Sequence, residues 1–569
     1  MAATLTGTTA ARRRRIPVTG SLRGPSRERR RILPAMTSTT VTELQVETVL
    51  GAPVQVFPDR FRALHEVLAA SLAHGDRPYI VTLDGRLTFA EHARRVSSIA
   101  HALRTEHGVE KGDRVAIAAA NSQAWIETFW ATVSIGAIAV GCNAWWSARE
   151  LRQALELTRP VLVVADERRR ALLDPATPTV AAAPTIDIDN DLAARYPDAA
   201  LPSADVAEDD PAVILFTSGT SGRPKGAVHT HRNLCSVIGF HRSMDAMAAQ
   251  YGDPVAPQDK VYLLAMPLFH VGSLHNLAVP RLANGSTVAL HVGAFEPARV
   301  LQLVQDARVT HWGAVPTMAN RLLEFDRVGD YDTSSLYAFS LASAPSSTAF
   351  KERLRAHLPF AGALVDSYGL TESCTAVALA TPLDLAESPG TLGTPIVGVE
   401  MEVRDALGNV LPPGEEGEIC VRSAYNMLGY WENPEATAAA IDDERWLHTG
   451  DLGIFDEKGR IRLVARRTDL IIRGGENVYP AEVEAVLTDH PDVRECVVLG
   501  VPHDDLGQEV AAVVVPADPD ADAAALEATL RAHAATELAH YKVPSHWRIG
   551  SAPLPRNATG KVIRTAVAP

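Results

Sequence analysis

Short apolar runs rich in β-branched residues alternate with helix-length segments along most of the chain. VAIAAA begins at Val115 and VLVVAD at Val161, and later runs cover 212–216, 261–265 and 287–291. Strands that are apolar on both faces are buried beneath helices, so this alternation predicts largely parallel sheets. The apolar stretch 124–142, interrupted by Glu127 and containing Gly136, is predicted to be a buried helix, with another helix after it.

The pattern changes after Gly450. Short strands with turn signals at 456–459, a helical stretch from Pro480 and a strand at 495–500 predict a smaller α+β domain. The polar, charged stretch 465–469 is the predicted boundary. We expect a basic, disordered leader over 1–35, a large α/β domain over 36–465, a hinge at 466–469 and a small domain over 470–569.

Charge is unevenly distributed along the chain. The net charge is −14, yet residues 1–35 hold nine Arg and one Glu, so the remainder carries −22. This argues against a nucleic-acid-binding body, because such surfaces need basic patches. The leader also has the composition of an organellar transit peptide, and initiation at Met36 is a further alternative.

The cysteines and the hydropathy pattern restrict the class of protein further. Five scattered cysteines without a C-x-x-C pair predict neither a disulfide framework nor a zinc site. No transmembrane segment or hydrophobic secretory signal is visible, so a cytoplasmic location is predicted.

The segment ILFTSGTSGRPKG, residues 214–226, combines an apolar strand with a loop of Gly, Ser and Thr followed by Arg and Lys. Close backbone approach, hydroxyl donors and positive charge suit polyphosphate oxygens. A flexible Ser/Gly turn is the alternative interpretation. The Walker A pattern GxxxxGK(S/T) does not occur, so a nucleotide must be held in another way.

Six motifs in a characteristic order extend this observation. They are TSGTSGRPKG at Thr217, PLFHVG at Pro267, DSYGLTE at Asp366, HTGDLG at His448, RRTDLIIRGGENVYP at Arg466 and LPRNATGK at Leu554. Over residues 60–565 the chain resembles the adenylate-forming enzymes, which include acyl-CoA and aryl-CoA synthetases, firefly luciferase and peptide-synthetase adenylation domains. Among these it is most similar to the acyl-CoA synthetases.

The resemblance implies an active site between a large domain of stacked sheets and a small mobile domain. It also implies an ATP-dependent carboxylic acid:CoA ligase, such as a fatty-acyl-CoA synthetase. A carboxylate attacks the α-phosphorus of ATP to give an acyl-adenylate and pyrophosphate, and CoA then displaces AMP to form the thioester. Two anions must meet, so positive charge is needed, and the implied cofactors are ATP, Mg²⁺ and CoA.

The resemblance assigns nucleotide-binding roles residue by residue. The phosphates are held by Thr217, Ser218, Gly219, Thr220, Ser221, Gly222 and Lys225. The adenine segments are Ser343, Ala344 and Pro345, together with Asp366, Ser367, Tyr368 and Gly369. Thr371 follows them, and Glu372 and Thr217 are the implied Mg²⁺ ligands. Asp451 accepts the ribose hydroxyls, and Arg466 is its partner at the ribose or a phosphate.

Further roles follow from the same resemblance. Lys561, otherwise a solvated tail lysine, bridges the substrate carboxylate and the α-phosphate. His270 has a positioning or gating role beside the reacting carboxylate, and Gly474 and Gly475 meet the pantetheine arm of CoA. Thr468 occupies the hinge position, where the family usually has Lys or Asp. Weaker candidates for the acyl pocket are Ser273, Trp312, Gly313, Ala314 and Cys374, whereas Trp145 and Trp146 are interpreted as packing residues.

Other functions stay open at this point. The chain is also compatible with a stand-alone adenylation enzyme that loads a carrier protein, with a catalytically silent nucleotide-binding scaffold, and with a light-emitting oxygenase. The complete set Lys225, Glu372, Asp451, Arg466 and Lys561 argues against the scaffold. Aliphatic and aryl acids are both open, with medium or long aliphatic acids preferred. The oligomeric state, including a homo-oligomer, is open too.

Overall fold

The computed structural model describes 44–173, 183–217, 224–250, 252–253, 255–341, 348–362, 364–466, 471–478, 480–552, 554–555 and 567. All of these residues belong to one compact unit, Leu44–Pro569. The predicted leader 1–35 lies outside the described residues.

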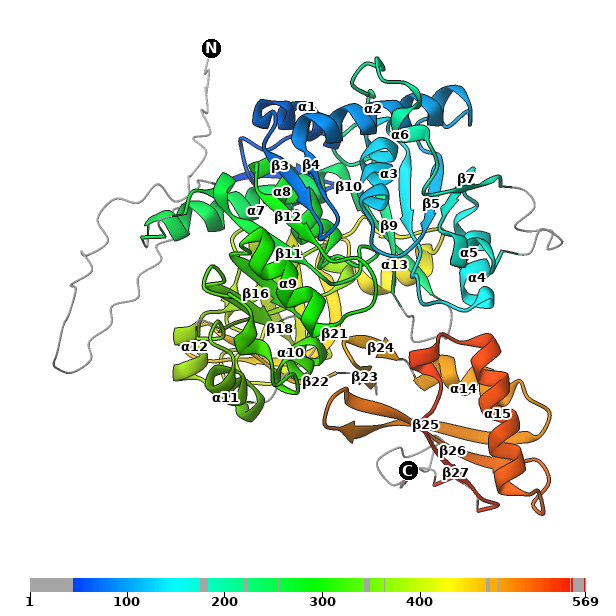
Figure 1. Cartoon of the computed structure of the whole chain (residues 1–569). Coiled ribbons are helices and arrows are strands. Elements are labelled where there is room, and N and C mark those ends of the chain that lie inside the picture. The colour runs from blue at the N-terminus through cyan, green and yellow to red at the C-terminus, as the bar shows by residue number, and fades with distance from the viewer. Residues whose placement is uncertain are drawn as a thin grey trace, which may run out of the picture. The chain divides into compact units, whose positions relative to one another are not determined.

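The large α/β part contains two large sheets, of which one has seven strands (Figure 1). Its order is β20 (Gly429–Tyr430), β10 (Lys225–Thr230), β9 (Pro211–Thr217), β6 (Ile138–Gly141), β5 (Arg114–Ala118), β7 (Leu162–Ala165) and β8 (Thr185–Asp187). The strands from β9 to β8 are parallel, whereas β10 and β20 are antiparallel additions at one edge.

The other large sheet has nine strands. Its order is β17 (Thr394–Pro395), β16 (Ala376–Ala380), β15 (Leu364–Gly369), β14 (Ala338–Leu341), β13 (His311–Ala314), β11 (Val261–Leu264), β12 (Thr287–Leu290), β3 (Pro78–Val81) and β4 (Arg86–Thr88). The strands from β15 to β3 are parallel, and antiparallel strands close both edges.

Smaller sheets complete the strand set. A hairpin pairs β1 (Gln45–Val49) with β2 (Ala52–Val56), and an antiparallel sheet contains β18 (Val399–Arg404), β19 (Gly417–Ser423), β21 (Leu447–Phe455) and β22 (Ile461–Arg466). The C-terminal sheet contains β24 (Glu476–Val478), β23 (Ile471–Arg473), β26 (Gly507–Pro516), β25 (Val493–His503) and β27 (His546–Ile549). Against it pack α14 (Pro480–Thr488) and α15 (Ala523–Glu537) (Figure 1).

The remaining helices connect these strands. They are α1 (Leu64–Ser71), α2 (Phe89–Thr105), α3 (Gln123–Ser134), α4 (Ala148–Thr158), α5 (Glu167–Arg170), α6 (Leu192–Arg195), α7 (His231–Gln250), α8 (Val279–Asn284), α9 (Pro297–Ala307), α10 (Pro316–Leu323), α11 (Thr348–His357), α12 (Pro382–Glu387) and α13 (Pro434–Ala440). Short 3-10 turns are η1 (Leu72–His74), η2 (Pro257–Asp259), η4 (Val328–Asp330), η5 (Thr371–Ser373) and η6 (His540–Lys542), and η3 (Leu274–Ala278) is a π-helix.

The predicted fold class is confirmed, because large, mostly parallel sheets precede a C-terminal α+β part. One element was predicted wrongly: the apolar stretch 124–142 is not a single helix. The Ser122 hydroxyl caps α3 by accepting a hydrogen bond from the Trp125 amide, and the helix ends at Ser134. Gly136 has a φ of +80°, which redirects the chain into β6 between β5 and β9.

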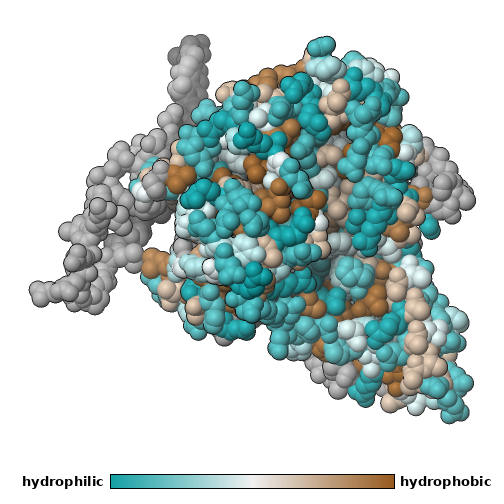
Figure 2. Space-filling model, viewed as in Figure 1, coloured by the Kyte–Doolittle hydropathy of each residue, from teal (hydrophilic) through white to brown (hydrophobic). Residues whose placement is uncertain are grey.

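Apolar side chains fill the space between α2, α3 and the sheets, where Phe89, Phe129 and Trp130 are fully buried. On the face shown in Figure 2, hydrophilic residues predominate and hydrophobic ones gather in small groups. Among the described helices, none is both long enough and apolar enough to cross a membrane.

Candidate active site

A cavity of about 440 Å³ lies at the carboxyl ends of the parallel strands. Gly141 ends β6, Thr217 ends β9 and Gly369 ends β15, and all three line it. Parallel strands end at one edge of a sheet, and this edge is where α/β proteins place their ligands. Segments of the C-terminal part complete the wall with Gly474, Gly475, Glu476, Glu482, Tyr541 and Lys542.

The cavity gathers residues from five of the six sequence motifs. Those predicted from the sequence that line it are Thr217, Lys225, His270, Gly369, Thr371, Glu372, Asp451, Gly474 and Gly475. Segments separated by more than two hundred residues therefore meet around one space, as the motif assignment requires.

Tyr430 joins a cation and a carboxylate in this wall. Its hydroxyl donates a hydrogen bond of 2.7 Å to Glu372 Oε1, and its ring centroid lies 4.9 Å from Lys225 Nζ. Lys225 begins β10 directly opposite Thr217 of β9, so the two ends of the predicted phosphate loop sit side by side. Sequence reasoning missed Tyr430, because a two-residue strand leaves no periodic pattern.

Asp451 is buried, and the Tyr368 hydroxyl donates a hydrogen bond of 2.7 Å to its Oδ2. Its backbone amide donates to Thr449 Oγ1. Arg466 on β22 is the register partner of Asp451, so the backbones of these two predicted residues lie side by side. The side chain of Arg466 is not part of the described structure.

Asp366 does not line this cavity, and neither do Ser367 and Tyr368. The Asp366 carboxylate forms a buried ion pair with Lys351 of α11. Burial raises the pKa of this carboxyl group, although the Lys351 ammonium opposes the shift. Asp366 therefore fixes α11 against β15 next to the site.

His270 is 37% exposed in its side chain, and its Nε2 lies 3.4 Å from Glu476 Oε1. Glu476 begins β24 in the C-terminal part, immediately after the Gly474–Gly475 turn. Gly475 has a φ of +85°, and a Cβ there would lie 3.1 Å from Val315. The predicted pantetheine turn thus packs closely against the end of β13, where a larger residue would be strained.

Both tryptophans that were interpreted as packing residues line the cavity. Trp146 is buried, whereas Trp145 is 38% exposed, with its ring 6.1 Å from that of Tyr541. The weaker acyl-pocket candidates are not part of this cavity wall: Ser273, Trp312, Gly313, Ala314 and Cys374. Ser273 instead donates a hydrogen bond to the Met266 carbonyl.

A buried charge triad joins α4 to the C-terminal part. Lys542 Nζ lies 2.7 Å from Glu150 Oε1 and 2.6 Å from Glu482 Oε1. Burial lowers the pKa of Lys542, but the Tyr541 phenol and the two carboxylates outweigh it, so the pKa is raised overall. Burial raises the pKa of Glu482. Sequence reasoning missed this triad because its members lie far apart in the chain.

Several predicted residues lie outside the described residues. They are Ser218, Gly219, Thr220, Ser221 and Gly222 of the phosphate loop, Ser343, Ala344 and Pro345 of the adenine segment, Thr468 at the hinge, and Lys561. Their roles stay predictions.

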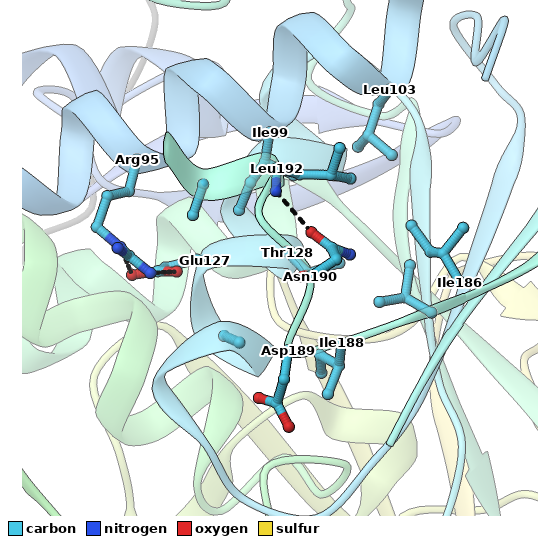
Figure 3. A pocket seen from close by; sticks show the side chains of 13 residues that line it. Arg95, Ile99, Leu103, Glu127, Thr128, Ile186, Ile188, Asp189, Asn190 and Leu192 are labelled. Atoms are coloured by element: carbon cyan, nitrogen blue, oxygen red, sulfur yellow. Dashed lines mark hydrogen bonds and ion pairs between the residues drawn. The ribbon is translucent and has the colours of Figure 1, made fainter. Parts of the chain in front are cut away.

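A second cavity of about 180 Å³ lies between α2, α3 and the segment 186–193 (Figure 3). Arg95 and Glu127 pair at 2.6 Å in its wall, and Asn190 accepts a hydrogen bond from the Leu192 amide. None of the six motifs contributes to this wall, so it gains no functional assignment.

Two family models match the chain. The AMP-binding enzyme model matches residues 68–431, and the AMP-binding enzyme C-terminal domain model matches residues 482–561. The cavity-lining residues up to Tyr430 and from Glu482 onward fall within these matches, whereas Thr449–Asp451 and Gly474–Glu476 lie between them.

Known proteins resemble the chain over most of its length. A feruloyl-CoA synthase of an Amycolatopsis species is 37% identical over 84% of this chain and 93% of that protein. A long-chain-fatty-acid–CoA ligase of Mycobacterium tuberculosis is 32% identical over 85% and 93%.

Solved structures of o-succinylbenzoate CoA synthetase from Bacillus subtilis are similar as well. A double mutant bound to a CoA product analogue gives a TM-score of 0.78 at 30% identity, covering 89% of this chain and 98% of that one. The same enzyme with its acyl-adenylate intermediate gives a TM-score of 0.64 at the same identity and coverage.

Proposed function

The chain belongs to the AMP-binding enzymes, and we propose that the 440 Å³ cavity is its active site. The family expectation from the motifs is thereby confirmed. The protein is an ATP-dependent carboxylic acid:CoA ligase, an AMP-forming acid–thiol ligase that works through an acyl-adenylate. One observation carries the placement of the site: residues of five motifs converge on this space.

The triphosphate end of ATP would lie at the base of the phosphate loop. The Lys225 ammonium supplies positive charge there, and Thr217 is its register partner across the β9–β10 pair, with both residues in the cavity wall. Both groups suit phosphate oxygens, because charge-assisted hydrogen bonds are the stronger ones. The loop residues Ser218, Gly219, Thr220, Ser221 and Gly222 would add backbone and hydroxyl donors.

The residues fit Mg²⁺ at the same end of the cavity. A carboxylate from Glu372 and a hydroxyl from Thr217 offer the oxygen ligands that this hard cation prefers, and both line the wall. Tyr430 fixes the Glu372 carboxylate by its hydrogen bond. Bound Mg²⁺ would neutralise phosphate charge during adenylation.

The ribose would bind at Asp451, whose carboxylate the Tyr368 hydroxyl orients. An ionised carboxylate accepts hydrogen bonds from vicinal hydroxyl groups. Ser343, Ala344, Pro345 and Gly369 would surround the adenine, and Asp366, Ser367 and Tyr368, which lie outside the cavity wall, would support that segment. Arg466 would lie beside the ribose or a phosphate. Lys561 would stabilise the charge that develops as the carboxylate attacks the α-phosphorus.

The arrangement of the C-terminal part supports its assignment to the thioester-forming step. The Gly474–Gly475 turn and Glu476 reach the cavity beside His270. The greater similarity to the product-analogue form of o-succinylbenzoate CoA synthetase, TM-score 0.78 against 0.64, agrees with this. Rotation about the hinge 466–469, between domains 36–465 and 470–569, would bring Lys561 into the site for adenylation.

For the acid, we propose a hydroxycinnamic acid such as ferulic acid as the first candidate, supported by the 37% identity to a feruloyl-CoA synthase. Met266, Phe269, Val271 and Met318 give the cavity an apolar side that suits a phenyl ring. A long-chain fatty acid is the second candidate, supported by the 32% identical relative and by the preference from the sequence.

The test measures AMP and pyrophosphate released from ATP and Mg²⁺ with hydroxycinnamic, benzoic, C8–C18 aliphatic and steroidal acids, with and without CoA. Mass spectrometry identifies the thioester. We expect a CoA thioester with a hydroxycinnamic acid at the highest kcat/KM. Adenylate without transfer to CoA would indicate a carrier-protein acceptor, and no product with any acid would favour the scaffold.

A cytoplasmic location is also our proposal. All five cysteines lie in the described part of the chain and none forms a disulfide, as is usual in a reducing compartment. Fractionation of the source cells with an antibody against the protein would test it.

A further inference from the structure

We infer that His229, His275 and Cys374, none of which lines the active-site cavity, form a binding site for a thiophilic transition-metal cation, Zn²⁺ or Cu⁺. One potential ligand atom from each residue lies within 4.8 Å of the other two, and all three residues are completely buried. They come from three elements: β10, the π-helix η3, and the residue that follows η5.

The three side chains converge closely. His275 Nδ1 lies 3.2 Å from Cys374 Sγ and 3.3 Å from the Cys374 carbonyl oxygen. The rings of His229 and His275 meet edge to face, with centroids 4.9 Å apart. Tetrahedral metal sites have comparable spacing, because metal–nitrogen bonds are about 2.0–2.1 Å and metal–sulfur bonds about 2.3 Å. Small rotations of these side chains would close them around an ion.

The site also contains polar atoms that the described structure leaves without partners. Both ring nitrogens of His229 and Nε2 of His275 are buried and meet no hydrogen-bond criterion. The Thr371 carbonyl lies close enough to the His229 ring to oppose the lowering of its pKa by burial, but it forms no well-aligned hydrogen bond with either ring nitrogen. A buried nitrogen without a hydrogen-bond partner is destabilising, and coordination to a cation would remove that penalty.

The backbone around the ligands is unusual. Cys374 has a φ of +63°, a left-handed conformation that non-glycine residues rarely adopt. His275 lies on a π-helix, a rare form that is frequently found at functional sites. Such conformations persist only where the surroundings hold them, and a metal that ties three elements together would do so.

Two imidazole nitrogens and one thiolate sulfur form a donor set that binds Zn²⁺ and Cu⁺ in preference to Mg²⁺, which favours oxygen ligands. On binding, the S–H bond of Cys374 breaks, the metal–sulfur bond forms and the proton passes to solvent. The ligand set then carries a charge of −1, which balances Cu⁺ and leaves Zn²⁺ with +1. This site is separate from the oxygen ligands proposed for Mg²⁺.

Each ligand follows an active-site residue along the chain. His229 lies four residues after Lys225, His275 five after His270, and Cys374 two after Glu372. The ion would therefore join the three elements that present these residues to the cavity. The sequence predicted no zinc site, because no C-x-x-C pair occurs and the three ligands are far apart in the chain.

The experiment uses the full-length, tag-free protein after removal of metal with a chelator. One sample is titrated with Zn²⁺, and a parallel sample with Co²⁺, which serves as a spectroscopic probe for the Zn²⁺ site. A third sample is titrated anaerobically with Cu⁺ in competition with a colorimetric chelator. We expect one equivalent to bind. Co²⁺ should give a near-ultraviolet sulfur-to-cobalt band, and the arm with the higher affinity identifies the ion.

Variants locate the binding. Cys374→Ser should abolish the sulfur-to-cobalt band, and His229→Gln should weaken metal binding at least about 100-fold. Cys235→Ser and His92→Gln remove another fully buried thiol and another buried imidazole without partners, and should bind as the wild type does. No stoichiometric binding, or a band that survives Cys374→Ser, would overturn the proposal.

A second cluster requires its own control. Ligand atoms of Glu418, Cys420 and His448 also lie within 4.8 Å of one another. A band that is lost in Cys420→Ser and kept in Cys374→Ser would therefore refute the buried site.

X-ray absorption on metal-loaded Cys420→Ser protein covers the case in which Cys374→Ser does not fold. A shell of one sulfur at about 2.3 Å supports the site, and a shell of nitrogen and oxygen alone overturns it.

Discussion

The Tyr430 hydroxyl donates a hydrogen bond of 2.7 Å to Glu372, and its ring lies 4.9 Å from the Lys225 ammonium. One side chain thus sets the spacing between the proposed Mg²⁺ ligand and the proposed phosphate-binding cation. The Met427 amide, which donates to the Glu372 carbonyl, fixes the backbone on the same side.

Replacing Tyr430 with Phe removes the hydrogen bond and keeps the ring beside Lys225. A hydrogen bond to a charged group contributes about 1.5 kcal/mol, so we expect kcat/KM for ATP to fall roughly tenfold. The Mg²⁺ concentration for half-maximal pyrophosphate release should rise. Glu372→Gln should raise it further, because the ligand charge is lost.

Tyr79→Phe is the matched control for this change. Its hydroxyl donates a bond of similar length, 2.8 Å, to the Ala278 carbonyl in the core. This variant should leave the Mg²⁺ dependence unaltered. Equal Mg²⁺ titrations for wild type, Tyr430→Phe and Glu372→Gln would contradict the metal assignment.

Lys561→Ala should separate the two half-reactions. Loss of a charge that acts only in the adenylation transition state should slow carboxylate-dependent pyrophosphate release at least about 100-fold. Conversion of supplied acyl-adenylate and CoA to the thioester should continue. Lys458→Ala, at an exposed residue paired with Glu387, is the control. Undiminished adenylation would remove Lys561 from the mechanism.

Lys542→Met should impair the opposite half-reaction. It leaves the carboxylates of Glu150 and Glu482 buried without their cation, which typically costs about 3–5 kcal/mol. Since the contact belongs to the proposed thioester-forming arrangement, thioester formation from acyl-adenylate should fall at least about tenfold while pyrophosphate release is retained. Single-turnover assays of each step would measure this.

Lys260 offers a matched control for that variant. Its ammonium is equally buried and lies 3.0 Å from Asp245 and 2.9 Å from Asp253, all within the large α/β part. Lys260→Met should lower stability without changing the ratio of the two half-reaction rates. If Lys542→Met lowers both rates alike, the triad does not distinguish the two arrangements.

Acid should destabilise the protein through its buried imidazoles, of which His92 is a clear case. Burial lowers its pKa to about 3, and Arg95 adds to the shift. As the pH falls below the ordinary value of 6.5, the unfolded chain gains a proton there that the folded chain does not. The free energy of unfolding should therefore fall, by about 2 kcal/mol for this group between pH 7 and pH 5.

His92→Gln should remove that contribution, so urea unfolding of the variant should lose less stability between pH 7 and pH 5 than wild type. His357→Gln, at an exposed helix position, should keep the wild-type pH dependence. An identical pH dependence in His92→Gln and wild type would contradict the lowered pKa.

Much of the fold could be predicted because strand signals are local. The runs at 212–216, 261–265 and 287–291 became β9, β11 and β12, and the helix expected from Pro480 became α14. The stretch 124–142 was predicted wrongly because its apolar residues suit a buried helix and a buried strand equally. The turn at Gly136 decided between them.

The residues of the site that belong to a sequence motif could be predicted. Thr217, Lys225, His270, Glu372 and Asp451 lie around one cavity. Tyr430, Glu476 and Lys542 could not be found, because single polar residues acquire roles only through contacts between distant segments. The same holds for the proposed His229, His275 and Cys374 site.

The pairing of Thr217 with Lys225 across β9 and β10 has a consequence for binding thermodynamics. The two ends of the intervening segment are already held one strand spacing apart, so loop-closure entropy is lost when the sheet forms rather than when nucleotide arrives. Nucleotide binding therefore incurs no closure cost at these two anchors. Changes of length between these two anchors should alter nucleotide affinity while leaving the β9–β10 register intact.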